Sequence, residues 1–264
     1  MTPRTLFVVR CWLALAVVLV PAWCLAAKRT AKTTPSDQPQ QETVDLFEAI
    51  DAGQIEVKFI AKNEKQARVR IKNKSDKPLS VRLPEAFAAR PVLAQIGPFG
   101  GGLNVGGPGG GSQNLGSTFN GGQNNGNNQN AGGANFFNVP AEKTGELRVP
   151  CVCLDYGKPT PRAAIPYELV PLETVCDKPS LAALLPKLDN SNQQEIQAAA
   201  WHIANDVTWQ ELAAARVEHL VVANEPLFTA KELKSAKELL DEATSMAASA
   251  QVASDFSTSA AASR

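Results

Sequence analysis

Histidine, methionine and tyrosine are scarce in this sequence, with two of each. The two histidines, His202 and His219, lie 17 positions apart (219 minus 202), without an HExxH motif or a Cys-x-x-Cys pair beside them. Metal sites in proteins need several such ligands at close spacing, so no metal site is expected. A Gly-x-Ser-x-Gly motif is also missing, which leaves serine hydrolysis without support.

Charge is absent from one long stretch. Between Pro91 and Ala141 the chain carries no Lys, Arg, Asp or Glu, and 15 of its 18 glycines fall between Gly97 and Gly133. Phosphate-binding loops use a lysine and calcium-binding repeats use aspartates, so neither ligand is expected here. The stretch also has few apolar side chains. Their burial could not offset the backbone entropy that its glycines would lose on folding. We therefore expect a disordered Gly/Asn/Gln-rich insertion over residues 97–135. Weak self-association of this insertion is the alternative.

The N-terminal segment has the parts of a secretory signal peptide over residues 1–26. Arg4 and Arg10 precede an apolar run, and small residues follow it at Ala26 and Ala27. An uncleaved anchor is the alternative, although the run is short for a membrane span of roughly 20 residues. We expect an extracytoplasmic protein (periplasmic, cell-surface or secreted) with no integral membrane span after cleavage.

Cleavage leaves 24 basic and 26 acidic residues, a net charge of 24 minus 26, or −2. Such a balance does not favour nucleic acid as a partner. An envelope protein or polysaccharide of unknown identity is the expected partner, and no cofactor is expected. Residues 27–43 are polar and predicted to form a disordered leader.

Three cysteines remain after cleavage, and in an oxidising compartment one disulfide with one spare thiol is the simplest arrangement. Cys151 and Cys153 are two apart and point to one face of a strand, so only one of them can reach Cys176. We expect the bond between Cys153 and Cys176, with Cys151 as the alternative partner. A thiol nucleophile paired with a histidine is a further alternative.

Residues 44–176, outside the insertion, show the alternation typical of strands. Ile55, Val57 and Phe59 alternate with polar residues, and the turn at 62–65 separates them from a second such run. Short strands are predicted at 55–60, 67–72, 79–83, 92–96, 136–140, 147–154 and 165–170. Frequent turn signals between them predict an immunoglobulin-like antiparallel β-sandwich in an α+β protein.

Helical spacing begins at residue 177 and predicts a small helical region over 177–248, after one short helix near 44–50. Ser191 with Gln194, Thr208 with Glu211, and Thr229 with Glu232 have the spacing of capping boxes. Residues 249–264 are rich in Ala and Ser and are predicted to be a disordered tail.

Trp201 and Trp209, with His202 between them, form the main aromatic feature of the helical region. These tryptophans are expected to pack as core aromatics on two adjoining helices. A ligand platform for a sugar or a base is the alternative. His202 is expected to be a packing or helix-end residue.

Three stretches, residues 55–60, 71–84 and 197–202, resemble an uncharacterised family of secreted bacterial proteins with a β-rich front, a Gly/Asn-rich insertion and a helical C-terminal part. The resemblance implies no activity. Cys153-Leu154-Asp155 and Gln197-Ala198-Ala199-Ala200-Trp201 are also similar to the two pieces of surface thioester domains, in which a Cys is joined to a Gln. That resemblance implies covalent adhesion through Cys153 and Gln197, although the spacing is shorter than in that family.

The sequence thus predicts a non-enzymatic envelope protein with a structural or binding role, and a Cys-dependent covalent adhesion module is the alternative. Gln197, Trp201, His202 and Trp209 are the candidate functional residues beside the cysteines.

Overall fold

The structure is a computed structural model, and it describes residues 42–92, 112–120, 135–217 and 225–262, with side chains as far as residue 253. The predicted signal peptide, nearly all of the predicted leader, four of the five residues of the strand expected at 92–96, and His219 lie outside these ranges.

The alternating residues after position 54 form an antiparallel hairpin, as predicted. Strand β2 (Ile55–Ala61) pairs with β3 (Gln66–Asn73), and the register runs from Ile55 opposite Asn73 to Ala61 opposite Ala67. In the turn, the side-chain oxygen of Asn63 accepts hydrogen bonds from two backbone N–H groups. Apolar residues of β3 are buried while the polar ones between them are exposed, so the hairpin has one wet face.

The hairpin is part of a closed antiparallel barrel, and the predicted immunoglobulin-like sandwich is therefore wrong. The barrel order is β2-β3-β8-β6-β5-β9, and β9 closes back on β2 where Phe59 lies opposite Tyr167. Its other strands are β5 (Phe87–Pro91), β6 (Leu115–Ser117), β8 (Thr144–Cys153) and β9 (Tyr167–Val170). Barrels and sandwiches are both built from short strands with alternating polar and apolar residues. They differ in whether the first and last strands of the sheet pair with each other.

The prediction that residues 97–135 form a disordered insertion is wrong for β6, because this strand lies within that range and is buried in the barrel. It pairs with β5 on one side and with β8 on the other, and Leu115 is fully buried. A Cβ atom at Gly116 would lie 3.1 Å from side-chain atoms of both Leu154 and Leu185. Gly116 therefore lets these side chains pack closely on the strand because it has no side chain of its own. A glycine in a linker serves instead to keep the backbone flexible.

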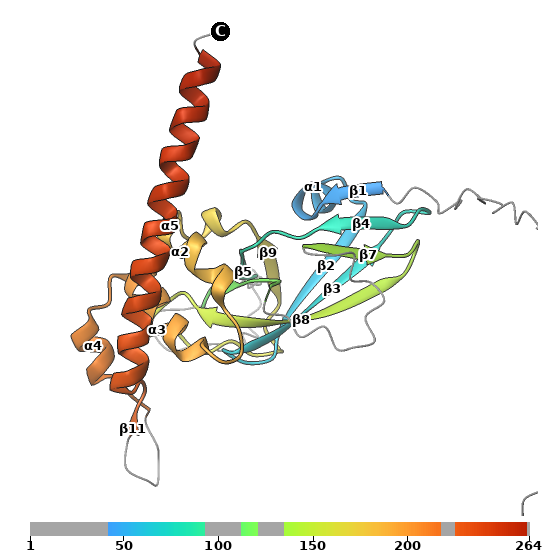
Figure 1. Cartoon of the computed structure of the whole chain (residues 1–264). Helices are drawn as coiled ribbons and strands as arrows, with labels where there is room; N and C mark the ends of the chain where they lie inside the picture. Colours follow the sequence, from blue (N-terminus) through green and yellow to red (C-terminus); the bar gives the residue numbers. More distant parts are fainter. Residues whose placement is uncertain (1–41, 93–111, 121–134, 218–224, 263–264) are drawn as a thin grey trace, which may run out of the picture. The chain divides into compact units, whose positions relative to one another are not determined.

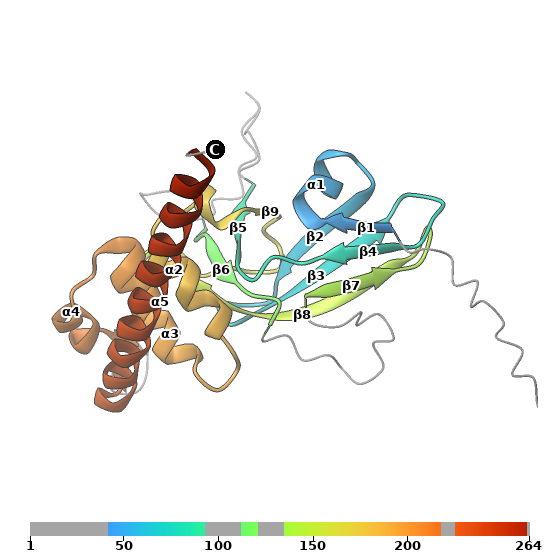
Figure 2. The same ribbon diagram turned by 45° about the horizontal axis from the view of Figure 1, so that its top comes forward.

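A smaller sheet lies beside the barrel strands (Figure 2). It contains β1 (Glu42–Asp45), β4 (Leu79–Arg82) and β7 (Phe136–Val139) in the order β1-β4-β7, and α1 (Leu46–Asp51) follows β1 directly. The buried side chain of Asn73 donates to the carbonyls of Lys77 and Val139, which ties the end of β3 to this sheet. The sheet and the barrel interior share one apolar core.

A second apolar core joins the outside of the barrel to the helices (Figure 1). At the end of β8, Cys151 and Cys153 face the first core, whereas Val152 and Leu154, the residue that follows the strand, face the second. From Val149 onward the strand is therefore buried on both faces, which explains the near-continuous apolar run in this half of β8. The helical elements are η1 (Leu172–Thr174), α2 (Pro179–Leu184), η2 (Leu185–Lys187), α3 (Gln193–Asn205), α4 (Trp209–Ala214) and α5 (Ala230–Ala262), with the short hairpin β10 (Arg216–Val217) and β11 (Glu225–Pro226) before α5.

Two of the three predicted capping boxes are present. The Thr208 and Glu211 side chains cap α4 reciprocally, and Thr229 with Glu232 makes the same bonds at the start of α5. The box predicted at Ser191 is wrong, because the Ser191 hydroxyl donates to Asp189 and α3 begins after Asn192. The predicted disordered tail is also wrong as far as Ala262, since α5 continues to that residue.

Within the described ranges, no helix combines the length and the apolar character that a membrane crossing requires.

Candidate functional site

The structure brings Cys153 and Gln197 together where α3 packs on β8. The backbone N–H of Cys153 donates to Oε1 of Gln197 at 2.7 Å, and Nε2 of Gln197 donates to the carbonyl of Cys153 at 2.8 Å. Gln197 is a buried polar residue, with 8% of its surface exposed. Both ends of its amide are therefore used in binding the backbone of one strand residue.

The end of β3 explains why α3 carries glutamine here. Pairing of β3 with β8 stops at Gln66 and Pro150, so the next β8 residues have no strand on that side. Buried backbone groups need hydrogen-bond partners. Gln193 and Gln197 lie one helical turn apart and supply them, because Nε2 of Gln193 donates to the carbonyls of Cys151 and Lys65.

The structure does not form the disulfide expected between Cys153 and Cys176, because all three cysteines are free thiols. Cys151 and Cys153 are buried in the barrel core, whereas Cys176 packs against the helical core. Burial raises the pKa of the Cys151 thiol to about 12, and it also raises the pKa of Cys153. Both thiols remain protonated at neutral pH, which makes them poor nucleophiles.

Trp209 contacts two side chains of the helical region. The His202 ring stacks on it with centroids 4.5 Å apart, and Nζ of Lys237 lies 5.3 Å from its centroid. The Nδ1 atom of His202 is 2.8 Å from the carbonyl of Val207, just after α3 ends. These contacts support the predicted packing role of His202 and give the Trp209 ring two partners within the protein.

Trp201 lies in a second aromatic cluster, edge to face with Tyr156 at 5.0 Å and Phe228 at 5.9 Å. It packs against both apolar cores. The core interpretation of Trp201 and Trp209 thus fits the contacts better than a stacking platform.

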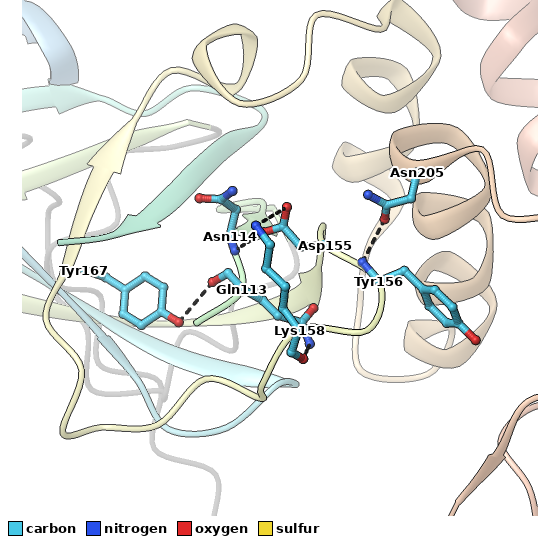
Figure 3. A network of polar contacts seen from close by, with 7 residues as sticks. All are labelled: Gln113, Asn114, Asp155, Tyr156, Lys158, Tyr167 and Asn205. Atoms are coloured by element: carbon cyan, nitrogen blue, oxygen red, sulfur yellow. Dashed lines mark hydrogen bonds and ion pairs between the residues drawn. The ribbon is translucent and has the colours of Figure 1, made fainter. Parts of the chain in front are cut away.

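Sequence reasoning missed a polar network that holds β6 in place (Figure 3). Asp155 accepts from the backbone N–H of Asn114 at 2.6 Å and forms an ion pair with Lys158 at 3.1 Å. The Gln113 amide donates to the carbonyl of Lys158, and the Tyr167 hydroxyl donates to the carbonyl of Gln113. The network anchors the residues before β6 to the loop between β8 and β9. Its only sequence signal was Asp155 immediately after the apolar run of β8.

Among the described residues, no group of three or more His, Cys, Asp and Glu side chains is placed to hold a metal ion. Comparison of the chain with protein-family models, with curated proteins and with solved structures gives no match in any of the three. The two resemblances noted from the sequence therefore remain predictions.

Proposed function

We propose that this chain is a non-enzymatic extracytoplasmic protein of the cell envelope with a structural or binding role. The signal-peptide pattern of residues 1–26 supports the location. The near-neutral charge supports a protein or polysaccharide partner in preference to nucleic acid.

One observation carries the non-enzymatic part of the proposal. The residues best suited for chemistry, Cys151, Cys153 and Gln197, are all committed to the fold. Both thiols are buried with raised pKa values, and the amide satisfies backbone groups that β3 leaves unpaired. A nucleophile would instead need an exposed thiol with a lowered pKa.

The second candidate is the covalent adhesion module, and the proximity of Cys153 and Gln197 favours it. Thioester formation would join the Cys153 sulfur to the side-chain carbonyl carbon of Gln197. The amide nitrogen would leave as ammonia and take the thiol proton with it. A partner amine would then form an amide with that carbonyl and release the Cys153 thiol.

Intact mass and thiol labelling separate the two candidates. For the mature protein we expect the mass of the unmodified chain, unchanged by reductant or by methylamine. In the folded state an alkylating reagent should modify Cys176 alone, and all three cysteines should react after unfolding. A mass lower by one ammonia that methylamine converts to a mass one methylene above that of the unmodified chain, with neither change in Cys153→Ala, would reject the structural role of Gln197 and support the adhesion module.

A further inference from the structure

The outer face of the hairpin β2–β3 and of β8 carries a surplus of positive charge. Its charged side chains are Glu56, Lys58, Arg68, Arg70, Lys72, Glu146 and Arg148, that is five cations against two anions. The whole mature chain is almost neutral, so this face is locally distinct. Lys62, in the turn after β2, extends the same cationic region.

Two of these arginines face each other across the strands. Arg68 on β3 lies directly opposite Arg148 on β8. Like charges in this position destabilise a sheet. Glu146 lies 3.7 Å from Arg68 but binds Arg70 at 2.7 Å, and it is the one ion-pair partner of Arg68 among the described residues. Within the described parts of the chain, Arg148 and Lys62 have no ion-pair partner.

A hollow of about 170 Å³ lies between these cations. Its polar lining consists of Lys62, Arg68, Arg148, Gln66 and Asn190, and no carboxylate is among the described residues that line it. A water molecule occupies roughly 30 Å³ in the liquid, so the hollow has room for a small anion and some of its water. The side chains around it offer guanidinium, ammonium and amide donors.

The backbone around the hollow is held by local hydrogen bonds. The N–H of Lys62 donates to the carbonyl of Gln66 at 2.8 Å, which fixes the β2–β3 turn. On the other side, Asp189 accepts from the backbone of Ser191 and Asn192, and these bonds hold the loop that carries Asn190. Lining residues on supported backbone need little rearrangement on binding, which favours affinity.

We propose that this hollow binds a dianionic tetrahedral oxyanion, the phosphate or sulfate group of a ligand. Two cations without a partner, Arg148 and Lys62, match a charge of two. The planar guanidinium of Arg148, with that of Arg68 opposite, suits bidentate bonds to such oxygens. Bound anion also removes the repulsion between the two arginines. The inference gives the proposed binding role a ligand class, and its failure would leave the thiol-labelling result unchanged.

Thermal unfolding tests the site directly. The mature protein is titrated with inorganic phosphate or sulfate at millimolar concentration, with sodium chloride added to keep the ionic strength constant. At ten times the dissociation constant, the ratio of folded to unfolded protein should rise about 11-fold, and Tm should rise accordingly. Arg148→Gln and Lys62→Gln should each lose this rise. Arg90→Gln is the matched control, because Arg90 is an exposed arginine on β5 that pairs with Glu168.

In salt without the oxyanion, Arg148→Gln should be at least as stable as the wild type, because the arginine repulsion is gone.

A sugar phosphate distinguishes the two sources of the ligand group: a larger Tm rise than with inorganic phosphate indicates a phosphorylated ligand, and an equal rise indicates the free ion. Phosphate and sulfate also stabilise proteins by exclusion from their surfaces. Equal Tm rises in the wild type and all three variants, or no rise in any, would overturn the proposal.

Discussion

Gly116 is a residue at which the barrel packs closely against the side chains of Leu154 and Leu185. Substitution by valine would place side-chain atoms against Leu154 and Leu185, since even a Cβ atom would lie 3.1 Å from both. Overpacking of this kind costs about 1–3 kcal/mol. We expect Gly116→Val to lower the free energy of unfolding by that amount in urea denaturation.

Gly157 provides the control for this prediction. It has a φ of +80° and nothing within 4 Å of an added Cβ, so its backbone conformation and not its small size is what matters. Asn tolerates this conformation, and Gly157→Asn should cost below about 1 kcal/mol. Equal losses in the two variants would show that close packing at Gly116 is unimportant.

Gln197 should be a major stabilising residue if its amide serves the backbone of Cys153. In Gln197→Met the side-chain volume is nearly kept, but a buried N–H and a buried carbonyl lose their partner. Each such group costs about 1–3 kcal/mol, so for the two groups we expect a loss of about 2–6 kcal/mol in the free energy of unfolding.

Gln194 is the matched control for Gln197, because it is a glutamine on the same helix. Its side chain makes one hydrogen bond, from Nε2 to the carbonyl of Leu227 at 3.1 Å. Gln194→Met should cost no more than about 1.5 kcal/mol. If both variants unfold at the same urea concentration, the pairing of Gln197 with β8 contributes nothing special.

The buried thiols predict a loss of stability in alkali. Burial raises the pKa of Cys151 to about 12, and that of Cys153 is raised as well, whereas an unfolded cysteine titrates near 8.5. Above this pH the unfolded state loses protons that the folded state keeps. Each thiol's stabilising contribution is complete below about pH 8.5 and then falls by up to about 1.4 kcal/mol per pH unit toward its folded pKa.

Urea unfolding between pH 8 and pH 10.5 measures this slope. Tyr167 adds a decline of the same sign, because burial raises its pKa too. The contribution of one thiol is therefore the difference in slope between the wild type and Cys151→Ala. Parallel slopes for the wild type and Cys151→Ala would contradict the buried-thiol explanation.

At the scale of elements, the helix starts test how far local sequence determines structure. Thr229 accepts from the N–H of Glu232, and the Glu232 carboxylate accepts from the backbone N–H of Thr229. Thr229→Ala removes one of these bonds and should cost about 1 kcal/mol, within a range of 0.5–2. Thr208→Ala at α4 should lower the free energy of unfolding, measured in urea, by a similar amount. Ser191→Ala should lower it by less than either, because the capping box predicted there does not form.

The elements that could be predicted from sequence are those with local causes. The β2–β3 hairpin follows from alternation and a polar turn, and the caps at Thr208 and Thr229 follow from spacing. Ser191 has the same spacing, but Asp189 competes for its hydroxyl and its N–H, a contact that spacing alone does not reveal. Local pattern is therefore informative where no nearby side chain offers an alternative bond.

At the scale of the whole molecule, barrel closure could not be predicted because its determinants are non-local. Strand β6 contains Leu115, Gly116 and Ser117, with a single large apolar side chain, and charge-free glycine-rich sequence surrounds it. Its burial depends on β5, β8 and η2, which lie elsewhere in the chain. The candidate site was found in part. Cys153 and Trp201 were singled out by residue type and Gln197 by the resemblance to thioester domains, whereas Arg148 and Lys62 become notable only through the cross-strand register and the hollow.

The same topology makes β6 indispensable despite its composition. Replacing residues 112–120 by an equally long Gly-Ser sequence removes the strand that joins β5 to β8 and the contacts made by Ser112, Gln113 and Thr118. Two buried strand edges would then be unpaired. We expect this variant to lose cooperative thermal unfolding and to aggregate in size-exclusion chromatography. A Gly-Ser replacement of residues 121–134 is the control, and it should unfold cooperatively. If the 112–120 replacement keeps the wild-type Tm, β6 does not close the barrel, and this glycine-rich part of the chain is only a linker.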